Sequence, residues 1–321
     1  MEILKSAAIL VIGFVLLIKG ADFFVEGSSS IAKRFHVPAI IIGLTIVAMG
    51  TSLPETAVSV VAAIQHKNTL AISNVVGSNI FNMMVVIGFC AIMTPVAVQK
   101  ATLKRDFPYS VFAALLLMIL GGVGMKLGRF DSAVFLVFFA IFIGTMIRMA
   151  LKAGKEGGHL QSEETEAAEA QKVMSMPKSL LFLVVGVAGI VIGGDVVVDS
   201  ASNIALKIGM SQTLVGLTIV SIGTSLPELV TSVVAARKNE VDMALGNAIG
   251  SNIFNILFVL GLAGVISPMP FLMENIIDIM ILIVLSLLIW GFAWTKEKIS
   301  RKEGIVMLVL YVVYVIYICM R

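Results

Sequence analysis

The sequence predicts an all-α polytopic membrane protein, in which ten transmembrane helices form two inverted-topology repeats of five helices each. Three observations predict it: an apolar composition, ten long apolar segments, and an internal repeat. Of the 321 residues, 59% are hydrophobic and 13% are charged, whereas soluble domains carry about 25% charged residues. The mean hydropathy is +1.04. This composition excludes a disordered chain, a disulfide scaffold, a collagen-like fibre and a nucleic-acid-binding protein, and it argues strongly against a soluble enzyme.

The apolar segments are long enough to cross a bilayer, which takes about 20 mostly apolar residues as a helix. The chain becomes apolar directly after its first five residues, and this segment lacks a small-residue cleavage site, so we interpret it as part of the first span and not as a removed signal peptide. The predicted spans are residues 4–30, 38–65, 70–94, 106–126, 130–151, 179–205, 211–236, 243–267, 273–295 and 304–320.

The distribution of Lys and Arg predicts the orientation, because cytoplasmic connections carry an excess of these residues. With the N-terminus outside, the cytoplasmic connections hold 16 Lys and Arg residues and the opposite side holds six, while Lys19 lies within a span. We therefore expect a multi-pass protein of the plasma (inner) membrane with both termini on the extracytoplasmic side.

One connection is long and hydrophilic. Residues 153–178 contain an acidic stretch without apolar periodicity, and they are too few to fold as a separate domain. We interpret them as a solvated cytoplasmic linker, with a regulatory cation-binding strip as the alternative. The predicted organisation is a first five-helix repeat at 1–152, this linker at 153–178, and a second, inverted repeat at 179–321.

The internal repeat is the strongest pattern in the chain. Residues 43–82 align with residues 216–255 without a gap, and 24 of the 40 positions are identical. Since each copy contains five spans, an odd number, the second copy must enter the bilayer in the opposite direction. Secondary transporters with inverted repeats bind their substrates near the membrane midplane, on interrupted helices. The most similar segments of the two copies are therefore expected to line such a site.

The first repeated motif is GTSLPE, at 50–55 and again at 223–228. Its proline lacks an N–H group and crowds the preceding turn, so carbonyl groups near Gly50 and Gly223 lose their helical partners. Such carbonyls are costly in a bilayer unless they line a cavity or bind a ligand. A glutamate within a span costs at least ~2.5 kcal/mol, which favours a functional role for Glu55 and Glu228 over the alternative of protonated glutamates that pack helices together. The motif also supplies hydroxyl groups, from Thr51, Ser52, Thr224 and Ser225.

The second repeated motif is GSNIFN, at 77–82 and 250–255. Ser78 and Asn82 share a helical face at i,i+4 spacing, as do Ser251 and Asn255. Hydrogen bonding between helices is the alternative role for these groups. Together the two motifs offer only oxygen ligands, which suit hard cations such as Na⁺ and Ca²⁺ and not Zn²⁺ or Cu⁺. Two carboxylates balance one Ca²⁺ or are shared by two or more Na⁺, so competition between the ions is a simple basis for exchange.

At these motifs the sequence resembles the sodium/calcium exchanger branch of the cation/calcium exchanger superfamily, over nearly the whole chain. The resemblance is to prokaryotic-type members without a large cytoplasmic regulatory domain. It implies alternating access, in which the first and sixth spans slide across the other eight. It also implies that Glu55 and Glu228 are central cation ligands, joined by hydroxyl oxygens of both motifs and by backbone carbonyls near Ala48 and Ser221.

One position departs from the family pattern. Some members carry an aspartate where Asn255 stands, so the formal charge of the predicted site is −2 instead of −3. This departure leaves the ion stoichiometry open and keeps H⁺/Ca²⁺ or K⁺-dependent Na⁺/Ca²⁺ antiport as the alternative to Na⁺/Ca²⁺ exchange. A passive cation channel is a further alternative, distinguished by single-channel current steps.

No catalytic role is expected, because the repeated polar segments contain neither His nor Cys. We therefore expect no enzyme activity and no cofactor, with Na⁺ and Ca²⁺ as transported ions, the lipid bilayer as surroundings and no nucleic-acid partner. The oligomeric state is open, a monomer being one option. Four further carboxylates in the first and sixth spans have two interpretations, a cation pathway or hydrogen bonding at helix ends: Asp22, Glu26, Asp195 and Asp199.

Overall fold

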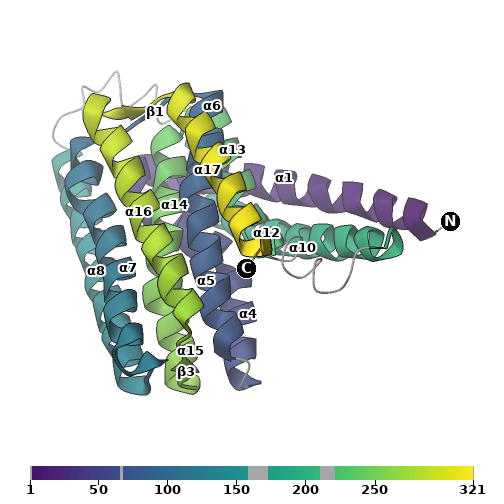
Figure 1. The fold of residues 1–321 in the computed structure, drawn as a ribbon. Helices are drawn as coiled ribbons and strands as arrows, with labels where there is room; N and C mark the ends of the chain where they lie inside the picture. The colour runs from purple at the N-terminus through teal and green to yellow at the C-terminus, as the bar shows by residue number, and fades with distance from the viewer. Residues whose placement is uncertain (1, 66–67, 158–172, 210–220, 321) are drawn as a thin grey trace. The chain divides into compact units, whose positions relative to one another are not determined.

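The structure is a computed structural model that describes residues 2–65, 68–157, 173–209 and 221–320. It is helical apart from short strand pairs (Figure 1). The chain forms two compact units. Unit 1 contains Met1–Thr51 and Ile141–Asn247, and unit 2 contains Ser52–Ala140 and Ala248–Arg321. Each unit thus combines segments of both predicted repeats, and the repeat boundaries at 152 and 179 stay a prediction.

Unit 1 is built on two long helices, α1 and α10, which lie side by side (Figure 1). Its elements are α1 (Glu2–Arg34), α2 (Ala39–Ile42), the π-helix η1 (Gly43–Val47), α3 (Ala48–Thr51), the second part of α8 (Arg129–Gly157), α10 (Met176–Lys207), α12 (Ser221–Gly223), α13 (Leu226–Arg237) and the first part of α14 (Val241–Phe254).

Glycines allow α1 and α10 to approach closely, and they do so symmetrically. A Cβ atom added at Gly20 would lie 2.6 Å from the backbone N of Ile190, and one added at Gly193 would lie 2.5 Å from the backbone N of Leu17. Gly20 and Gly193 are equivalent positions of the two repeats, and so are Leu17 and Ile190. Small residues are the usual means of close helix packing in membranes. The reciprocal contacts mean that equivalent helices of the two repeats cross about a local two-fold axis.

Unit 2 consists mainly of helices that the sequence predicts as spans. Its elements are α4 (Leu53–Ile64), α5 (Asn68–Phe81), η2 (Asn82–Val86), α6 (Ile87–Met93), β1 (Val96–Ala97), η3 (Thr102–Asp106), α7 (Phe107–Gly122), η4 (Val123–Met125), β2 (Lys126–Leu127), the first part of α8, the second part of α14, η6 (Asn255–Leu260), α15 (Gly261–Ile266), β3 (Met269–Pro270), α16 (Met273–Lys296), β4 (Lys298–Ile299) and α17 (Arg301–Met320).

Two antiparallel strand pairs, which the sequence analysis does not predict, follow the repeat symmetry. β1 pairs with β4 and β2 with β3. Met125 and Glu297, which precede β2 and β4, both have positive φ, at 50° and 51°. Their carbonyl oxygens accept equivalent hydrogen bonds from Phe271 N and Val98 N, at 2.9 and 2.8 Å. The same short connection is therefore built twice from different residues.

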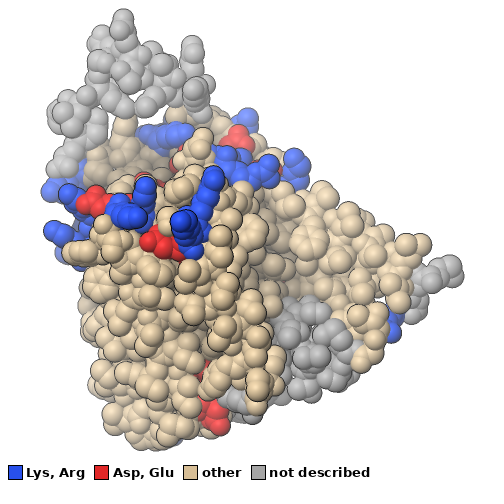
Figure 2. Space-filling model, turned by 45° about the horizontal axis from the view of Figure 1, so that its top comes forward, with Lys and Arg blue, Asp and Glu red and all other residues tan. Residues whose placement is uncertain are grey.

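The helices match the predicted spans wherever the structure describes them. Eight described helices are long and apolar enough to cross a membrane, and a ninth candidate is the pair Ala39–Thr51 and Leu53–Ile64, bent by 49°. The predicted span 211–236 lies partly outside the described residues, and its described part contains α12 and α13. The space-filling view shows wide surfaces without any charged side chain (Figure 2), as contact with lipid requires. The linker predicted at 153–178 is helical at both ends, up to Gly157 and from Met176, and 158–172 lie outside the described residues.

Candidate functional site

The GTSLPE motif interrupts a helix in the way that its proline predicts. Helix α3 ends at Thr51, Ser52 is the N-cap of α4, and Pro54 is its second residue. The repeat mate Ser225 caps α13, with Pro227 again at the second helical position. Proline is tolerated there because the first N–H groups of a helix have no intrahelical partner. As a result each glutamate lies in the first turn of the second half-helix, where the helix dipole favours a negative charge.

Unit 2 contains the first set of buried polar side chains from the two motifs, which we call the Glu55 cluster: Glu55, Ser78, Asn79, Asn82, Ser251, Asn252 and Asn255. Glu55 is fully buried. Its Oε1 lies 3.5 Å from Ser78 Oγ of α5, which is a long hydrogen bond. The serine predicted from the second motif thus faces the glutamate predicted from the first.

Two asparagines of the GSNIFN motifs hold this cluster together by a reciprocal pair of hydrogen bonds. Asn79 Nδ2 donates to the carbonyl of Asn252, and Asn252 Nδ2 donates to the carbonyl of Asn79, both at 3.1 Å. Asn255 Nδ2 then donates to Asn79 Oδ1 at 3.2 Å. Because Asn79 and Asn252 are repeat mates, a local two-fold axis passes between them as well.

Several oxygen atoms of the Glu55 cluster are buried without a hydrogen-bond partner in the part of the chain that the structure describes. Among them are Asn82 Oδ1, Ser251 Oγ, Asn252 Oδ1 and Asn255 Oδ1. An unsatisfied buried polar group costs about 1–3 kcal/mol, so such atoms in a native protein call for a ligand, an ion or water. Asn82 and Asn255 also begin π-helical turns, η2 and η6, and π-bulges are frequent at functional sites. Oxygen atoms of this kind match the ligands that Na⁺ and Ca²⁺ prefer.

Unit 1 contains the second group, the Glu228 cluster: Glu228, Thr51, Ser232 and Asn247. All four side chains are buried. Asn247 Nδ2 lies 2.9 Å from Ser232 Oγ and 3.3 Å from the carbonyl oxygen of Glu228. Its Oδ1 lies 3.0 Å from Thr51 Oγ1, which donates. One amide thereby joins the GTSLPE motif of the first repeat to that of the second.

The predicted ligands divide between the two units. Unit 1 holds Ala48, Thr51, Ser221, Thr224, Ser225 and Glu228, and unit 2 holds Ser52, Glu55, Ser78, Asn82, Ser251 and Asn255. The carbonyl oxygen of Ala48 lies 3.3 Å from Thr51 Oγ1. Ser221 begins α12, and its side chain lies outside the described residues. The role of each of these residues as a ligand stays a prediction.

The sequence analysis missed the asparagines and serines that position the ligands. Asn79 and Asn252 link the motifs, and Asn247 has a repeat mate, Asn74, whose Nδ2 donates to Ser59 Oγ at 3.2 Å. Ser59 is likewise the repeat mate of Ser232. A signal existed, since all of these polar residues are identical in the two copies.

Two of the four additional carboxylates have a partner that explains them. Lys238 Nζ lies 3.4 Å from Asp22 Oδ1 and 3.8 Å from Glu26 Oε2. Lys19 Nζ also lies 4.0 Å from Asp22 Oδ2. These contacts favour a structural role for Asp22 and Glu26 over a cation pathway, because two ammonium groups balance the two carboxylates.

Comparisons with known proteins agree with this arrangement of motifs. The family described as "Sodium/calcium exchanger protein" matches residues 5–148 and 178–320. The chain belongs to this family. It is 39% identical to "Putative antiporter CaxA" of Alkalimonas amylolytica, covering 96% of this chain and 97% of the relative. It is 34% identical to "Sodium/calcium exchanger MaX1" of Methanosarcina acetivorans, covering 95% of each.

A solved structure of the sodium-calcium exchanger NCX_Mj, soaked with zero Na⁺ and Ca²⁺, has a TM-score of 0.83 to this chain at 34% identity, covering 98% of both chains. Membership of the family confirms that the chain is a membrane transporter and not an enzyme. It also confirms the predicted fold class, an all-α membrane protein of ten helices in two inverted repeats.

Proposed function

We propose that the chain exchanges Na⁺ for Ca²⁺ as a secondary active antiporter, and that both ions compete for the oxygen atoms of the Glu55 and Glu228 clusters. The observation that carries the proposal is the full burial of two carboxylates in repeated motifs, together with buried serine and asparagine oxygen atoms of unit 2 that have no hydrogen-bond partner among the described residues. A fully buried, ionised carboxylate is very costly unless a positive charge neutralises it.

The transported cations would supply that positive charge. One Ca²⁺ carries two positive charges, and two Na⁺ carry the same total. Either ion would therefore balance the charge of the two carboxylates, which is why the two ions would compete. Hydroxyl oxygens of Thr51, Ser52, Thr224, Ser225, Ser78 and Ser251, amide oxygens of Asn82 and Asn255, and carbonyl oxygens of Ala48 and Ser221 would replace the water around the ion.

The inverted repeat supports alternating access. Equivalent motifs run in opposite directions through the membrane, related by a two-fold axis. A geometry that opens the binding oxygens to one side therefore has an equivalent geometry that opens them to the other side. We place both termini on the extracytoplasmic side of the plasma membrane, because the opposite connections carry 16 of the 23 Lys and Arg residues.

The test is ⁴⁵Ca²⁺ uptake into proteoliposomes loaded with Na⁺ and diluted into Na⁺-free buffer. We expect uptake that requires the outward Na⁺ gradient and that is lost in Glu55→Gln and in Glu228→Gln, while both variants still insert and elute as the wild type does. Glu297→Gln is the matched control, since Glu297 is exposed and paired with Lys100 at the surface, where an ion pair contributes little.

Other results would replace the proposal by a different function. Ca²⁺ uptake that follows a pH gradient and ignores Na⁺ would establish proton coupling, and uptake that also needs K⁺ would establish the K⁺-dependent reaction. Wild-type rates from either glutamate variant would exclude the proposed ligands.

A further inference from the structure

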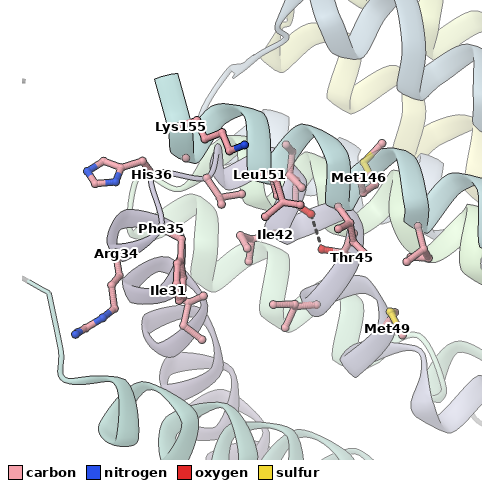
Figure 3. A pocket seen from close by; sticks show the side chains of 17 residues that line it. Ile31, Arg34, Phe35, His36, Ile42, Thr45, Met49, Met146, Leu151 and Lys155 are labelled. Atoms are coloured by element: carbon pink, nitrogen blue, oxygen red, sulfur yellow. Dashed lines mark hydrogen bonds between the residues drawn. The ribbon is translucent and has the colours of Figure 1, made fainter. Parts of the chain in front are cut away.

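Unit 1 contains a cavity of about 650 Å³ whose lining includes none of the predicted cation ligands. It lies between the end of α1, the π-helix η1 and the C-terminal part of α8 (Figure 3). Its volume falls within the range of about 300–1,000 Å³ that is typical of small-molecule sites. The glutamates of the two clusters are not among its lining residues.

The walls of the cavity are apolar. Ile, Leu, Met and Val side chains line most of it, and the hydroxyl of Thr45 is turned to its own helix, where it donates to the carbonyl of Ile41 at 2.7 Å. Such a surface offers water no hydrogen-bond partner. Ile147 and Leu151, on the α8 side, are 54% and 63% exposed. Hydrocarbon can therefore enter the cavity sideways from the bilayer.

One end of the cavity is basic. Figure 3 shows Arg34, His36 and Lys155 at this end and Met49 and Met146 at the other. Arg34 and Lys155 lie in the last turns of α1 and α8, so the basic end is where two spans leave the membrane. Arg34 Nη1 donates to the carbonyl of Met174 at 3.3 Å. Because a carbonyl group has no net charge, this bond does not neutralise the guanidinium group. Within the described ranges no carboxylate pairs with these three side chains, whereas their neighbour Lys33 is paired with Glu240 at 3.5 Å.

We propose that this cavity binds one anionic phospholipid, with an acyl chain between η1 and α8 and the phosphate group at Arg34, His36 and Lys155. The apolar walls match the acyl chain of a phospholipid, and the basic end matches its phosphate group. The two features lie in the order in which a phospholipid in the bilayer presents these parts. The basic end also lies on the side that the Lys and Arg distribution predicts to be cytoplasmic, where anionic lipids attract juxtamembrane basic residues. The bound chain would pack on η1, the segment that leads into Met49 and the GTSLPE motif.

The experiment measures lipid binding to the purified full-length protein in neutral detergent by native mass spectrometry, with phosphatidylglycerol and phosphatidylcholine of identical chains. We expect phosphatidylglycerol to bind as a 1:1 complex and more tightly than phosphatidylcholine. The double variant Arg34→Gln/Lys155→Gln should bind phosphatidylglycerol roughly tenfold to thirtyfold more weakly, since each basic residue near an anionic headgroup contributes to binding. Lys298→Gln/Lys302→Gln removes the same charge from exposed positions of unit 2 and should leave the affinity unchanged.

Cavity-filling variants test the acyl chain separately. Ala150→Phe and Ile147→Trp add bulk to two lining positions, and each should reduce phosphatidylglycerol binding while the basic end is intact; two positions guard against one variant that fails to fold. Glycerol phosphate, which has the headgroup without the chains, should not compete.

Four outcomes would overturn the proposal. The first two are an equal loss of phosphatidylglycerol affinity in the Arg34/Lys155 and Lys298/Lys302 variants, and an equal affinity of the wild type for both lipids. The other two are unchanged phosphatidylglycerol binding in the cavity-filling variants, and competition by glycerol phosphate alone. A change of elution volume in the cavity-filling variants would assign the cavity to a second copy of the chain instead.

Discussion

Asn247 is the residue whose contacts most clearly exceed those of its repeat mate. It joins Thr51, Ser232 and the carbonyl of Glu228, whereas Asn74 makes one hydrogen bond among the described residues, to Ser59. A buried amide that satisfies three groups holds them in fixed positions, because each group left without it would pay its own desolvation cost. Among the described residues, Asn247 therefore has more hydrogen-bond partners than Asn74, although the two positions are identical in sequence.

This asymmetry predicts different effects for two identical substitutions. Asn247→Ala should weaken the apparent Ca²⁺ affinity in the proteoliposome assay about tenfold or more, since it removes three hydrogen bonds at roughly 1 kcal/mol each. Asn74→Ala should change it less than about threefold, for the loss of one hydrogen bond. Equal effects would mean that Asn247 does not position the ligands.

Asn255 is held as a neutral residue by its surroundings. Its Nδ2 donates to Asn79 Oδ1, and Asn79 cannot turn its amide without losing the bond to the carbonyl of Asn252. A carboxylate at position 255 would therefore face an oxygen atom at about the same distance.

We expect Asn255→Asp to lower the melting temperature of the purified protein in EDTA, because the new carboxylate is repelled by Asn79 Oδ1. The increase in melting temperature on adding Ca²⁺ should be larger than in the wild type, because a bound cation removes this repulsion and binding to the folded state stabilises it. Asn255→Ala, which loses the amide without adding a charge, separates the two effects. Differential scanning fluorimetry measures the melting temperature of each variant with and without Ca²⁺. A smaller Ca²⁺-dependent increase in Asn255→Asp than in the wild type would contradict the prediction.

At the scale of elements, the crossing of α1 and α10 depends on glycine. The added Cβ atoms at Gly20 and Gly193 would meet backbone atoms, which have no rotamer by which to move away. The crossing brings together helices from the two predicted repeats, so it couples their movement within unit 1.

Gly20→Ala and Gly193→Ala should each destabilise the protein by about 1–3 kcal/mol, the usual cost of overpacking. Gly144→Ala in α8 is the matched control, since nothing lies within 4 Å of its added Cβ, and alanine favours a helix over glycine. Thermal melting monitored by fluorescence-detected size exclusion should show lower midpoints for the first two variants only. An unchanged midpoint in Gly20→Ala would mean that the helices separate at no cost.

At the scale of the whole molecule, the inverted repeat makes a prediction about sidedness. Lys126 of β2 and Lys298 of β4 are both exposed, and each follows a residue with positive φ in an equivalent connection. Five spans separate the two positions, so the predicted topology places them on opposite sides of the membrane.

An impermeant maleimide should label Lys126→Cys in intact cells and Lys298→Cys only after permeabilisation. A Cys319→Ser background removes the exposed native thiol, and the other cysteine, Cys90, is buried. Labelling of both positions from one side would exclude an inverted repeat, and labelling of Lys298→Cys alone in intact cells would reverse the predicted orientation.

The sequence by itself determined the membrane class, the span positions, the duplication and the types of ligand. Apolar length, charge distribution and the chemistry of glutamate, serine and asparagine are local properties, and each can be read along the chain without knowing its partners. The bend at Ser52 and Pro54 follows in the same way, because a missing N–H group acts on its own turn.

Only the tertiary structure decided which polar groups meet. Identical motifs predict identical surroundings, yet Asn247 bonds Thr51 as well as Ser232, whereas Asn74 bonds Ser59 and no other residue within the described part of the chain. Asn79 is paired with Asn252 from the other repeat. These partners lie 173 or more positions apart in several cases, so no pattern of spacing contains them. The lipid cavity likewise exists because α1, η1 and α8 leave a space between them, which depends on how three helices pack and not on any one of their sequences.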